Sequence, residues 1–310
     1  MKKFIVLPDL TCDLSEEIRE YVNLNDYVTG YTQINGESIV TRLDWSQISR
    51  EDFYNALANK KNRVSSAAPN PEDYHRAFSK YAKEGYDILS MSISSKISST
   101  YSVATVSAKK VMEEYPDCKI YCFDSLRMSG AFGLLVMYAS EMQNAGKSMD
   151  EIISWLEENK LKVHQMGPID DLTFIARRGK ISKGKAFMGN LIGIKPMGDC
   201  NKDGYVTVLG KAKGIKNALT ATVKYLKELA VDVENQYILI SHSDREKIAF
   251  ELKEKIESEI KCKKLFVSDV YSGCGTNIGP GMIGVYFLGE TVSDECEKEK
   301  AVLLNALENL

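Results

Sequence analysis

The sequence predicts an α/β protein with two domains, and two patterns support this fold class. In residues 3–160, short apolar runs of strand length alternate with segments of helical periodicity, which is typical of βαβ units and a mostly parallel sheet. Farther along the chain, the turn Asn201-Lys202-Asp203-Gly204 separates two strand-like runs and indicates a hairpin, so a mixed sheet is expected there. A chain of 310 residues is long enough for two buried cores.

The first domain is expected over residues 1–165, with a Rossmann-like, mostly parallel sheet. Pro71 begins a helix, where its missing N–H is no loss, and the acids Glu72 and Asp73 follow in the first turn, where they suit the helix dipole. The expected strands are Phe4–Leu7, Ile88–Ile93 and Lys119–Phe123, and the expected helices are Ser15–Tyr21, Phe53–Lys60, Pro71–Lys83, Thr100–Glu114, Gly130–Asn144 and Met149–Glu158.

A second α/β domain is expected over residues 166–290, followed by a C-terminal helix over residues 291–310. The apolar residues of that helix fall on one stripe, which predicts that it docks on the protein; they are Val302, Leu303, Ala306, Leu307 and Leu310. The other expected elements are a short helix Asp170–Ala176, the hairpin within Ile194–Lys211, helices Ile215–Leu229 and Asp244–Ser258, and strands Gln236–Ile240, Lys264–Val267 and Gly284–Leu288.

Composition argues against several classes of protein. Forty basic residues face 43 acidic ones, for a formal net charge of −3, whereas nucleic-acid binding needs a basic surplus or stripe. The apolar run at the start of the sequence is interrupted too soon for a signal peptide. The sequence contains no run of about 18 apolar residues, so no membrane span is expected. Seven scattered cysteines indicate reduced thiols in the cytoplasm, and three histidines leave little material for a metal site.

Three local patterns suggest chemistry that their surroundings do not favour. Gly279-Pro280-Gly281-Met282-Ile283-Gly284 matches a dinucleotide-binding motif, but a strand follows it where that motif requires a helix. Asp199–Gly204 resembles the start of a calcium loop, but position twelve is Gly210 instead of glutamate, which favours a hairpin turn. His242 lies just past a strand and is a candidate base, yet no recognisable nucleophile motif accompanies it.

Two hydroxyl-rich loops are the strongest candidates for a binding site. The segment from Ser94 to Tyr101 lies where a strand ends and a helix begins, which is where ligands bind in open α/β sheets. Hydroxyls and free N–H groups at a helix start suit an anion such as a carboxylate. The loop Val64–Pro69 has the same character. Both loops are equally compatible with ordinary helix caps.

Taken in order, seven segments resemble motifs of the DegV family, over roughly residues 3–289. In the N-terminal half, Asp9–Leu14 is similar to the family's D-S-T-x-D-L, Ser66–Pro71 to T-S-Q-P-S-P, Ile93–Tyr101 to I-S-S-K-L-S-G-T-Y, and Asp124-Ser125 to D-S. In the C-terminal half, Arg178–Ser182 is similar to R-G-G-R-I-S, Ile194–Pro196 to I-K-P, and Gly275–Gly284 to G-T-H-x-G-P-G-x-x-G.

This resemblance implies a two-domain fold that holds one long-chain fatty acid, such as palmitate or oleate, between the domains. It implies that Ser66, then Ser94 or Ser95, and the Thr276-Asn277 loop bind the carboxylate. It further implies a carrier without catalysis or cofactor, which presents the acid to a fatty acid kinase for conversion to acyl phosphate.

The sequence departs from the family pattern at several positions that bear on the ligand. Asn277 replaces the motif's histidine, and Lys213 replaces an arginine after the hairpin. Leu10, Ala67 and Ala68 replace polar residues.

Our hypothesis is a cytoplasmic lipid-binding protein with Ser66, Ser94, Ser95, Thr276, Asn277 and Lys213 at its ligand. An acyl-ester hydrolase or other enzyme that uses His242 is the first alternative. A regulatory protein with a degraded lipid site is the second.

Overall fold

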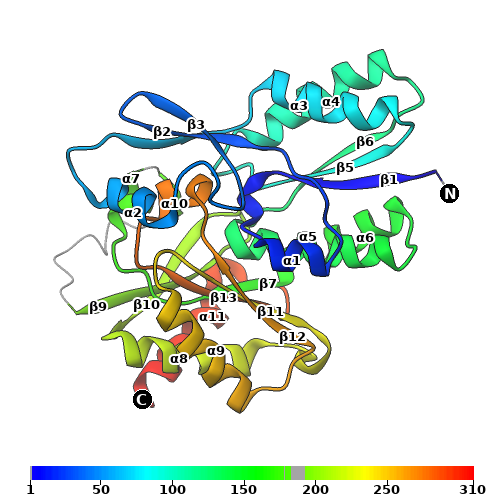
Figure 1. Cartoon of the computed structure of the whole chain (residues 1–310). Helices are drawn as coiled ribbons and strands as arrows, with labels where there is room; N and C mark the ends of the chain where they lie inside the picture. The colour runs from blue at the N-terminus through cyan, green and yellow to red at the C-terminus, as the bar shows by residue number, and fades with distance from the viewer. Residues whose placement is uncertain (1, 178, 183–192) are drawn as a thin grey trace.

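The computed structural model describes residues 2–177, 179–182 and 193–310; Arg178 of the expected Arg178–Ser182 segment lies outside them. Figure 1 shows two α/β domains side by side, the N-terminal one built around β1, β5 and β6 and the C-terminal one around β7 and β9 to β13. This confirms the predicted fold class.

The N-terminal sheet is parallel and has the strand order β1-β5-β6, as expected from the βαβ pattern. Its strands are β1 (Phe4–Pro8), β5 (Asp87–Ser92) and β6 (Ile120–Asp124). Helices α3 (Pro71–Lys83) and α4 (Thr100–Glu114) pack on one face through residues such as Phe78 and Ala104, and both helices have their predicted bounds. At the start of α3, Asn70 and Asp73 form a reciprocal capping box.

The chain also forms a small antiparallel sheet, β3-β2-β4, that the sequence analysis did not predict. Its strands are β2 (Gly30–Ile34), β3 (Glu37–Thr41) and β4 (Val64–Ala67). Asn35 and Gly36 join β2 to β3 with positive φ at both positions, which is the geometry of a tight hairpin turn. Helix α2 (Arg50–Ala58) follows β3 and precedes β4 along the chain. It begins before its predicted start at Phe53, because the Ser49 side chain accepts the N–H of Asp52 and caps the helix.

The C-terminal domain contains the predicted mixed sheet, with strand order β12-β11-β13-β7. β11 (Tyr237–His242) pairs parallel to β12 (Lys264–Asp269) and antiparallel to β13 (Ile283–Leu288), which pairs in turn with β7 (Val163–Met166). The expected domain boundary after residue 165 falls inside β7.

The predicted hairpin is formed by β9 (Ile194–Cys200) and β10 (Val206–Lys213), with β8 (Ile181–Ser182) beside β10. The remaining helices of the C-terminal half are α7 (Thr173–Arg177), α8 (Ile215–Leu229), α9 (Glu246–Glu259), α10 (Ser272–Ile278) and α11 (Glu297–Glu308). The last of these docks as predicted, because Leu303 and Leu307 pack where Gly210 has no side chain. Leu310, at the end of the stripe, is exposed.

Helix α5 (Ser129–Asn144) joins the two domains into one core. Its residues 129–137 are all buried, and its apolar side chains share one cluster with Phe123 of the first sheet and Leu239 of the second. A helix that is apolar all round belongs inside a protein. Helices α1 (Glu16–Tyr21) and α6 (Met149–Asn159) lie beside α5 in one layer, below β1 in Figure 1.

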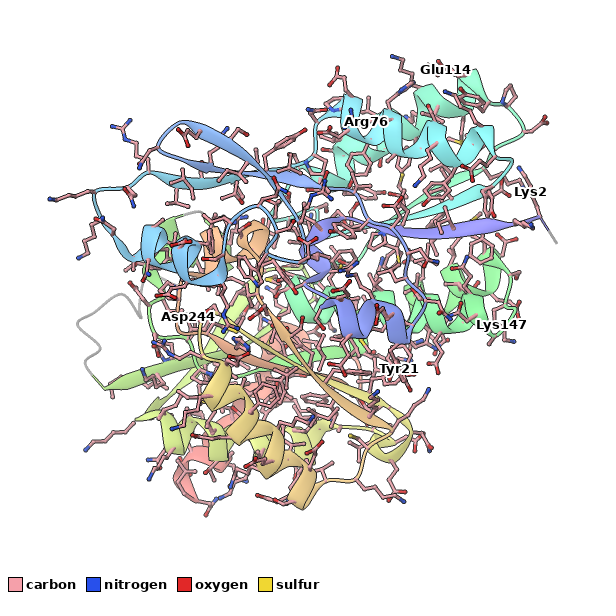
Figure 2. The ribbon with its side chains drawn as sticks, in the orientation of Figure 1. Lys2, Tyr21, Arg76, Glu114, Lys147 and Asp244 are labelled. Carbon is pink, nitrogen blue, oxygen red and sulfur yellow. The ribbon has the colours of Figure 1, made fainter. Side chains whose placement is uncertain are left out.

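Charged side chains gather on the outer helices. Figure 2 shows Arg76, Glu114 and Lys147 on the outside of the N-terminal domain. Among the described residues, none of the helices has the length and apolar content needed to cross a bilayer.

Candidate functional site

A two-armed cavity lies between the domains. The polar arm and the apolar arm share Met128, Ile175, Val206 and Ile278 in their walls, so the two arms adjoin each other. They enclose about 700 and about 560 Å³, respectively, with their open mouths included.

Hydroxyl and amide groups line the polar arm. They come from the ends of strands in the N-terminal domain, from the start of α4 and from α10; the polar lining residues are Thr11, Tyr31, Ser66, Ser98, Thr100, Lys180, Cys274 and Asn277. Lys180 is the charged residue in this part of the described lining, and its ammonium group favours an anion nearby.

Ser66 and Asn277, both predicted from the sequence, meet at the wall of the polar arm. The Asn277 amide donates hydrogen bonds to Ser66 Oγ at 3.1 Å and to Thr276 Oγ1 at 3.0 Å. Since Ser66 Oγ accepts a hydrogen bond from Asn277, its own O–H remains available to donate to a ligand. Thr276 is buried behind Asn277 and holds the amide in place without lining either arm.

The start of α4 provides a second polar group. Ser98 Oγ and Thr100 Oγ1 lie 2.8 Å apart, and both residues line the polar arm. The fifteen-residue helix α4 begins at Thr100, so the positive end of its dipole also faces this arm. Within the hydroxyl-rich segment that the sequence analysis singled out, Ser98 and Thr100 line this arm, whereas the predicted Ser94 and Ser95 do not.

Ser94 and Ser95 have other contacts. Ser94 is fully buried, and its Oγ donates to the carbonyl of Gly204 at 3.0 Å, in the turn of the β9–β10 hairpin. Ser95 donates its backbone N–H to Asp124 at 3.0 Å. Neither residue lines an arm, and Lys213 is exposed on β10. Ser94 therefore fixes the hairpin against the N-terminal domain.

The apolar arm extends over β13, β7 and the β9–β10 hairpin. Four flexible thioethers contribute to its walls, together with branched aliphatic side chains; the apolar lining includes Met128, Met166, Ile169, Leu172, Ile175, Met197, Val206, Val208, Ile278, Met282 and Ile283. Such a surface binds hydrocarbon, because burial removes apolar area from water on both partners.

Two buried carboxyl groups support the wall behind the polar arm. Burial raises the pKa of Asp13 to about 8, although Ser129 Oγ donates to it at 2.6 Å and Tyr271 N–H at 3.1 Å. Burial likewise raises the pKa of Asp9, while Thr11 and the N–H of Ile93 lower it. The thiol of Cys274 has a pKa well above its usual value because it is buried near Asp13, so it is neutral and a poor nucleophile.

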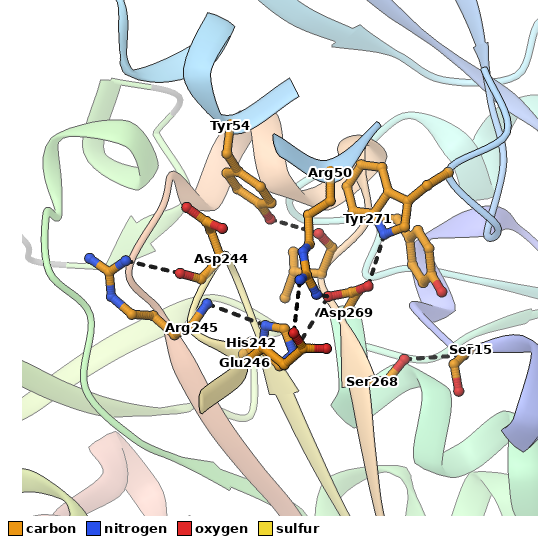
Figure 3. Close-up of polar contacts among 12 residues, drawn as sticks. Ser15, Arg50, Tyr54, His242, Asp244, Arg245, Glu246, Ser268, Asp269 and Tyr271 are labelled. Carbon is orange, nitrogen blue, oxygen red and sulfur yellow. Dashed lines mark hydrogen bonds and ion pairs between the residues drawn. The ribbon is translucent and has the colours of Figure 1, made fainter. Parts of the chain in front are cut away.

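His242 belongs to a polar cluster away from both arms (Figure 3). Its Nδ1 accepts the backbone N–H of Arg245 at 3.4 Å, and its Nε2 lies 3.5 Å from Asp269 Oδ1. Burial lowers the pKa of His242, although Asp269 opposes this. Both ring nitrogens face protein groups and His242 lines neither arm, so the geometry does not support a base for ester hydrolysis.

The same cluster fastens α2 to the C-terminal domain. Arg50 bonds Asp269 and Glu246 at 3.0 Å each, while Trp45 Nε1 donates to Asp269 at 2.8 Å. Tyr54 donates to the carbonyl of Val270 at 2.6 Å (Figure 3). These contacts hold α2 over α10, the helix that carries Asn277.

The described residues contain no group of three or more His, Cys, Asp or Glu side chains placed to hold a metal ion. The glycine-rich Gly279–Gly284 segment leads into strand β13, so the predicted conflict with a dinucleotide motif is confirmed.

Comparison with known proteins places the chain in a family. Residues 3–290 match the family model described as an uncharacterised protein of the DegV family. A DegV domain-containing protein of Clostridium perfringens is 34% identical over 291 residues, which cover 94% of this chain and 99% of that protein.

Solved structures share the fold. A Thermus thermophilus DegV family protein, described by its fatty acid binding, superposes with a TM-score of 0.83 at 23% identity and covers 93% of this chain and 100% of its own. The Streptococcus pneumoniae Fatty Acid Kinase (Fak) B3 protein, loaded with linoleic acid, gives a TM-score of 0.77 at 21% identity, with the same coverage. The descriptions of both structures refer to fatty acids. The chain belongs to the DegV family.

Proposed function

We propose that this protein binds one long-chain fatty acid, such as palmitate or oleate, in the cavity between its domains. The observation that carries the proposal is a hydroxyl-lined arm that adjoins an apolar arm across four shared wall residues. Solved relatives from Thermus thermophilus and Streptococcus pneumoniae are described with fatty acids, which supports the same ligand here.

The carboxylate is held in the polar arm. Ser66 donates its free O–H to one oxygen, while Ser98, Thr100 and Lys180 face the other. A buried carboxylate without such partners would be costly. Ser94, which the sequence analysis placed at the head group, acts indirectly by holding the hairpin that carries Val206 of the shared wall.

The hydrocarbon chain supplies most of the affinity. Burial of about 14 methylenes at ~0.8 kcal/mol each contributes roughly 11 kcal/mol before the costs of association. The hydroxyl groups then orient the acid and satisfy its oxygens.

The second part of the proposal is that the protein presents its fatty acid to a kinase that forms an acyl phosphate. The name of the Streptococcus pneumoniae relative supports this. The protein would act in the cytoplasm, and its seven cysteines are free, as a reducing compartment requires.

Mass spectrometry of an organic-solvent extract, together with the native mass of the complex, tests ligand binding. One equivalent of a long-chain fatty acid is expected. If no lipid is present and neither palmitate nor oleate is taken up, the proposed function is wrong.

Three serine variants test the head-group assignment. Ser66→Ala should weaken palmitate binding about tenfold, because the carboxylate loses a charge-assisted hydrogen bond. Ser65→Ala is the matched control, since Ser65 lies on the opposite face of β4 and bonds Gln33. Ser94→Ala should lower stability by about 1 kcal/mol and change affinity less than Ser66→Ala does. Equal affinities of Ser66→Ala and Ser65→Ala would contradict the assignment.

A further inference from the structure

Three glycines in the described lining of the apolar arm are there for different reasons. An added Cβ would lie 1.9 Å from the Ile283 carbonyl oxygen at Gly167, and 2.2 Å from the Thr207 carbonyl oxygen at Gly198. Neighbouring backbone excludes a side chain at these two positions, whatever the cavity contains.

Gly284 is different, because a Cβ there would meet only side-chain atoms among its nearest neighbours. It would lie 2.7 Å from the Tyr286 hydroxyl oxygen, 2.9 Å from Tyr286 Cζ and 3.4 Å from Met282 Sδ. All three residues line the apolar arm; Gly284 and Tyr286 share one face of β13 because side chains alternate along a strand, and Met282 directly precedes the strand. The Tyr286 side chain is therefore folded back across the space that Gly284 leaves.

The ring of Tyr286 is confined on the side of helix α5. A Cβ on Gly130 would lie 2.3 Å from Tyr286 Cε2 and 2.7 Å from Ser241 Oγ, so ring, helix and sheet are in close contact. Tyr286 is 3% exposed. Because α5 blocks one side of the ring and the cavity lies on another, we expect a group added at position 284 to displace Tyr286 toward the cavity.

Gly284 lies beyond the walls that the two arms share. It lines the apolar arm alone, whereas Ser66 and Asn277 line the polar arm alone. A fatty acid held by its carboxylate at Ser66 reaches Gly284 only if its chain extends past the shared residues.

On the basis of the proposed function, we propose that Gly284 and the Tyr286 ring folded across it set the upper length of acyl chain that the cavity accepts. Gly284 adds no side chain to this part of the cavity wall, and the position of the Tyr286 ring sets how much space remains for the acyl chain. The last glycine of the motif at residues 279–284 thus has a role in ligand selection.

Binding of laurate, palmitate and stearate by Gly284→Ala and Gly284→Val tests the proposal. Both variants should weaken stearate binding by about tenfold or more and leave laurate binding within about twofold, because added groups in a packed wall force neighbours into the cavity. Tyr286→Leu should act in the opposite direction and favour stearate over laurate relative to the unmodified protein.

A double variant at positions 284 and 286 and a control for folding separate the proposed effect on chain length from a general loss of structure. Tyr286→Phe removes the atom nearest to the added Cβ, so Gly284→Ala with Tyr286→Phe should recover part of the lost stearate affinity. Thermal unfolding and retained laurate binding report whether each variant is folded. Equal weakening for all three acids, or an unchanged length profile in Gly284→Ala and Tyr286→Leu, would overturn the inference. An unmodified protein that binds none of the acids would instead overturn the proposed function.

Discussion

The two arms of the cavity are built in different ways. In the polar arm, a few side chains supplied by separate elements converge, and each has a defined hydrogen-bond partner, as Ser66 has in Asn277. In the apolar arm, many methyl, methylene and thioether groups share the wall, and none of them has a directional contact to make. In the proposed complex, head-group recognition is therefore concentrated in a few residues, whereas chain recognition is spread over many.

Asn277→Asp should cause the largest loss, because it places a carboxylate beside the carboxylate of the ligand. Like charges in a partly buried site repel strongly, so the affinity for palmitate should fall on the order of a hundredfold at neutral pH. Isothermal titration calorimetry would measure this, with Asn277→Gln as the neutral control. A loss no greater than that of the control would show that the head group lies elsewhere.

Asp13→Asn should change how the free energy of unfolding depends on pH. This variant tests the buried carboxyl group behind the polar arm. The folded-state pKa of Asp13 is raised to about 8, above its unfolded value, so the folded state binds the proton more tightly. Its favourable contribution is present at pH values below the unfolded pKa near 4 and is lost as pH rises through about 8.

Urea unfolding between pH 5 and 9 would measure this effect. The unmodified protein should lose stability as pH rises over this range, and Asp13→Asn should lose less. His164 adds to the same trend, because Asp199 raises its pKa against the effect of burial and its stabilisation is also lost at high pH. A slope that Asp13→Asn leaves unchanged would assign the trend to other groups.

Ile169→Val should cause the smallest loss of palmitate affinity. It tests whether chain recognition in the apolar arm is spread over many residues. It removes one methylene from the apolar wall, which is worth ~0.8 kcal/mol, or about fourfold in affinity. Competition binding with palmitate would detect it. A loss as large as that of Ser66→Ala would mean that chain recognition is concentrated rather than spread.

Local sequence signals predicted most of the fold. The bounds of α3, α4 and α8 agree with prediction because turn residues and apolar periodicity mark both ends of these helices. The strands β2 to β4 were missed, although Asn35-Gly36 is a strong hairpin signal. Helix α10 was missed because Ser272–Ile278 contains two glycines, which disfavour a helix in isolation. It forms under α2, where the ring of Phe53 packs against Gly275.

The site was only partly predictable for a related reason. The order of motifs along the chain brought Ser66 and Asn277 together correctly. Within the hydroxyl-rich segment, however, Ser94 and Ser98 differ only in the direction that the loop gives their side chains. That direction depends on the turn in which the N–H of Ser98 bonds the carbonyl of Ser94, and on the hairpin that captures Ser94 Oγ.

The buried position of α5 has a kinetic consequence. Because this helix packs against both sheets within a single apolar cluster, a hinge motion that parts the domains would expose that cluster at a cost of about 25 cal/mol per Å². Uptake and release of a ligand must therefore proceed by small local openings of the cavity wall. Such openings unfold little structure. Backbone amide hydrogen exchange should therefore be faster in the loops that line the cavity than in the buried part of α5.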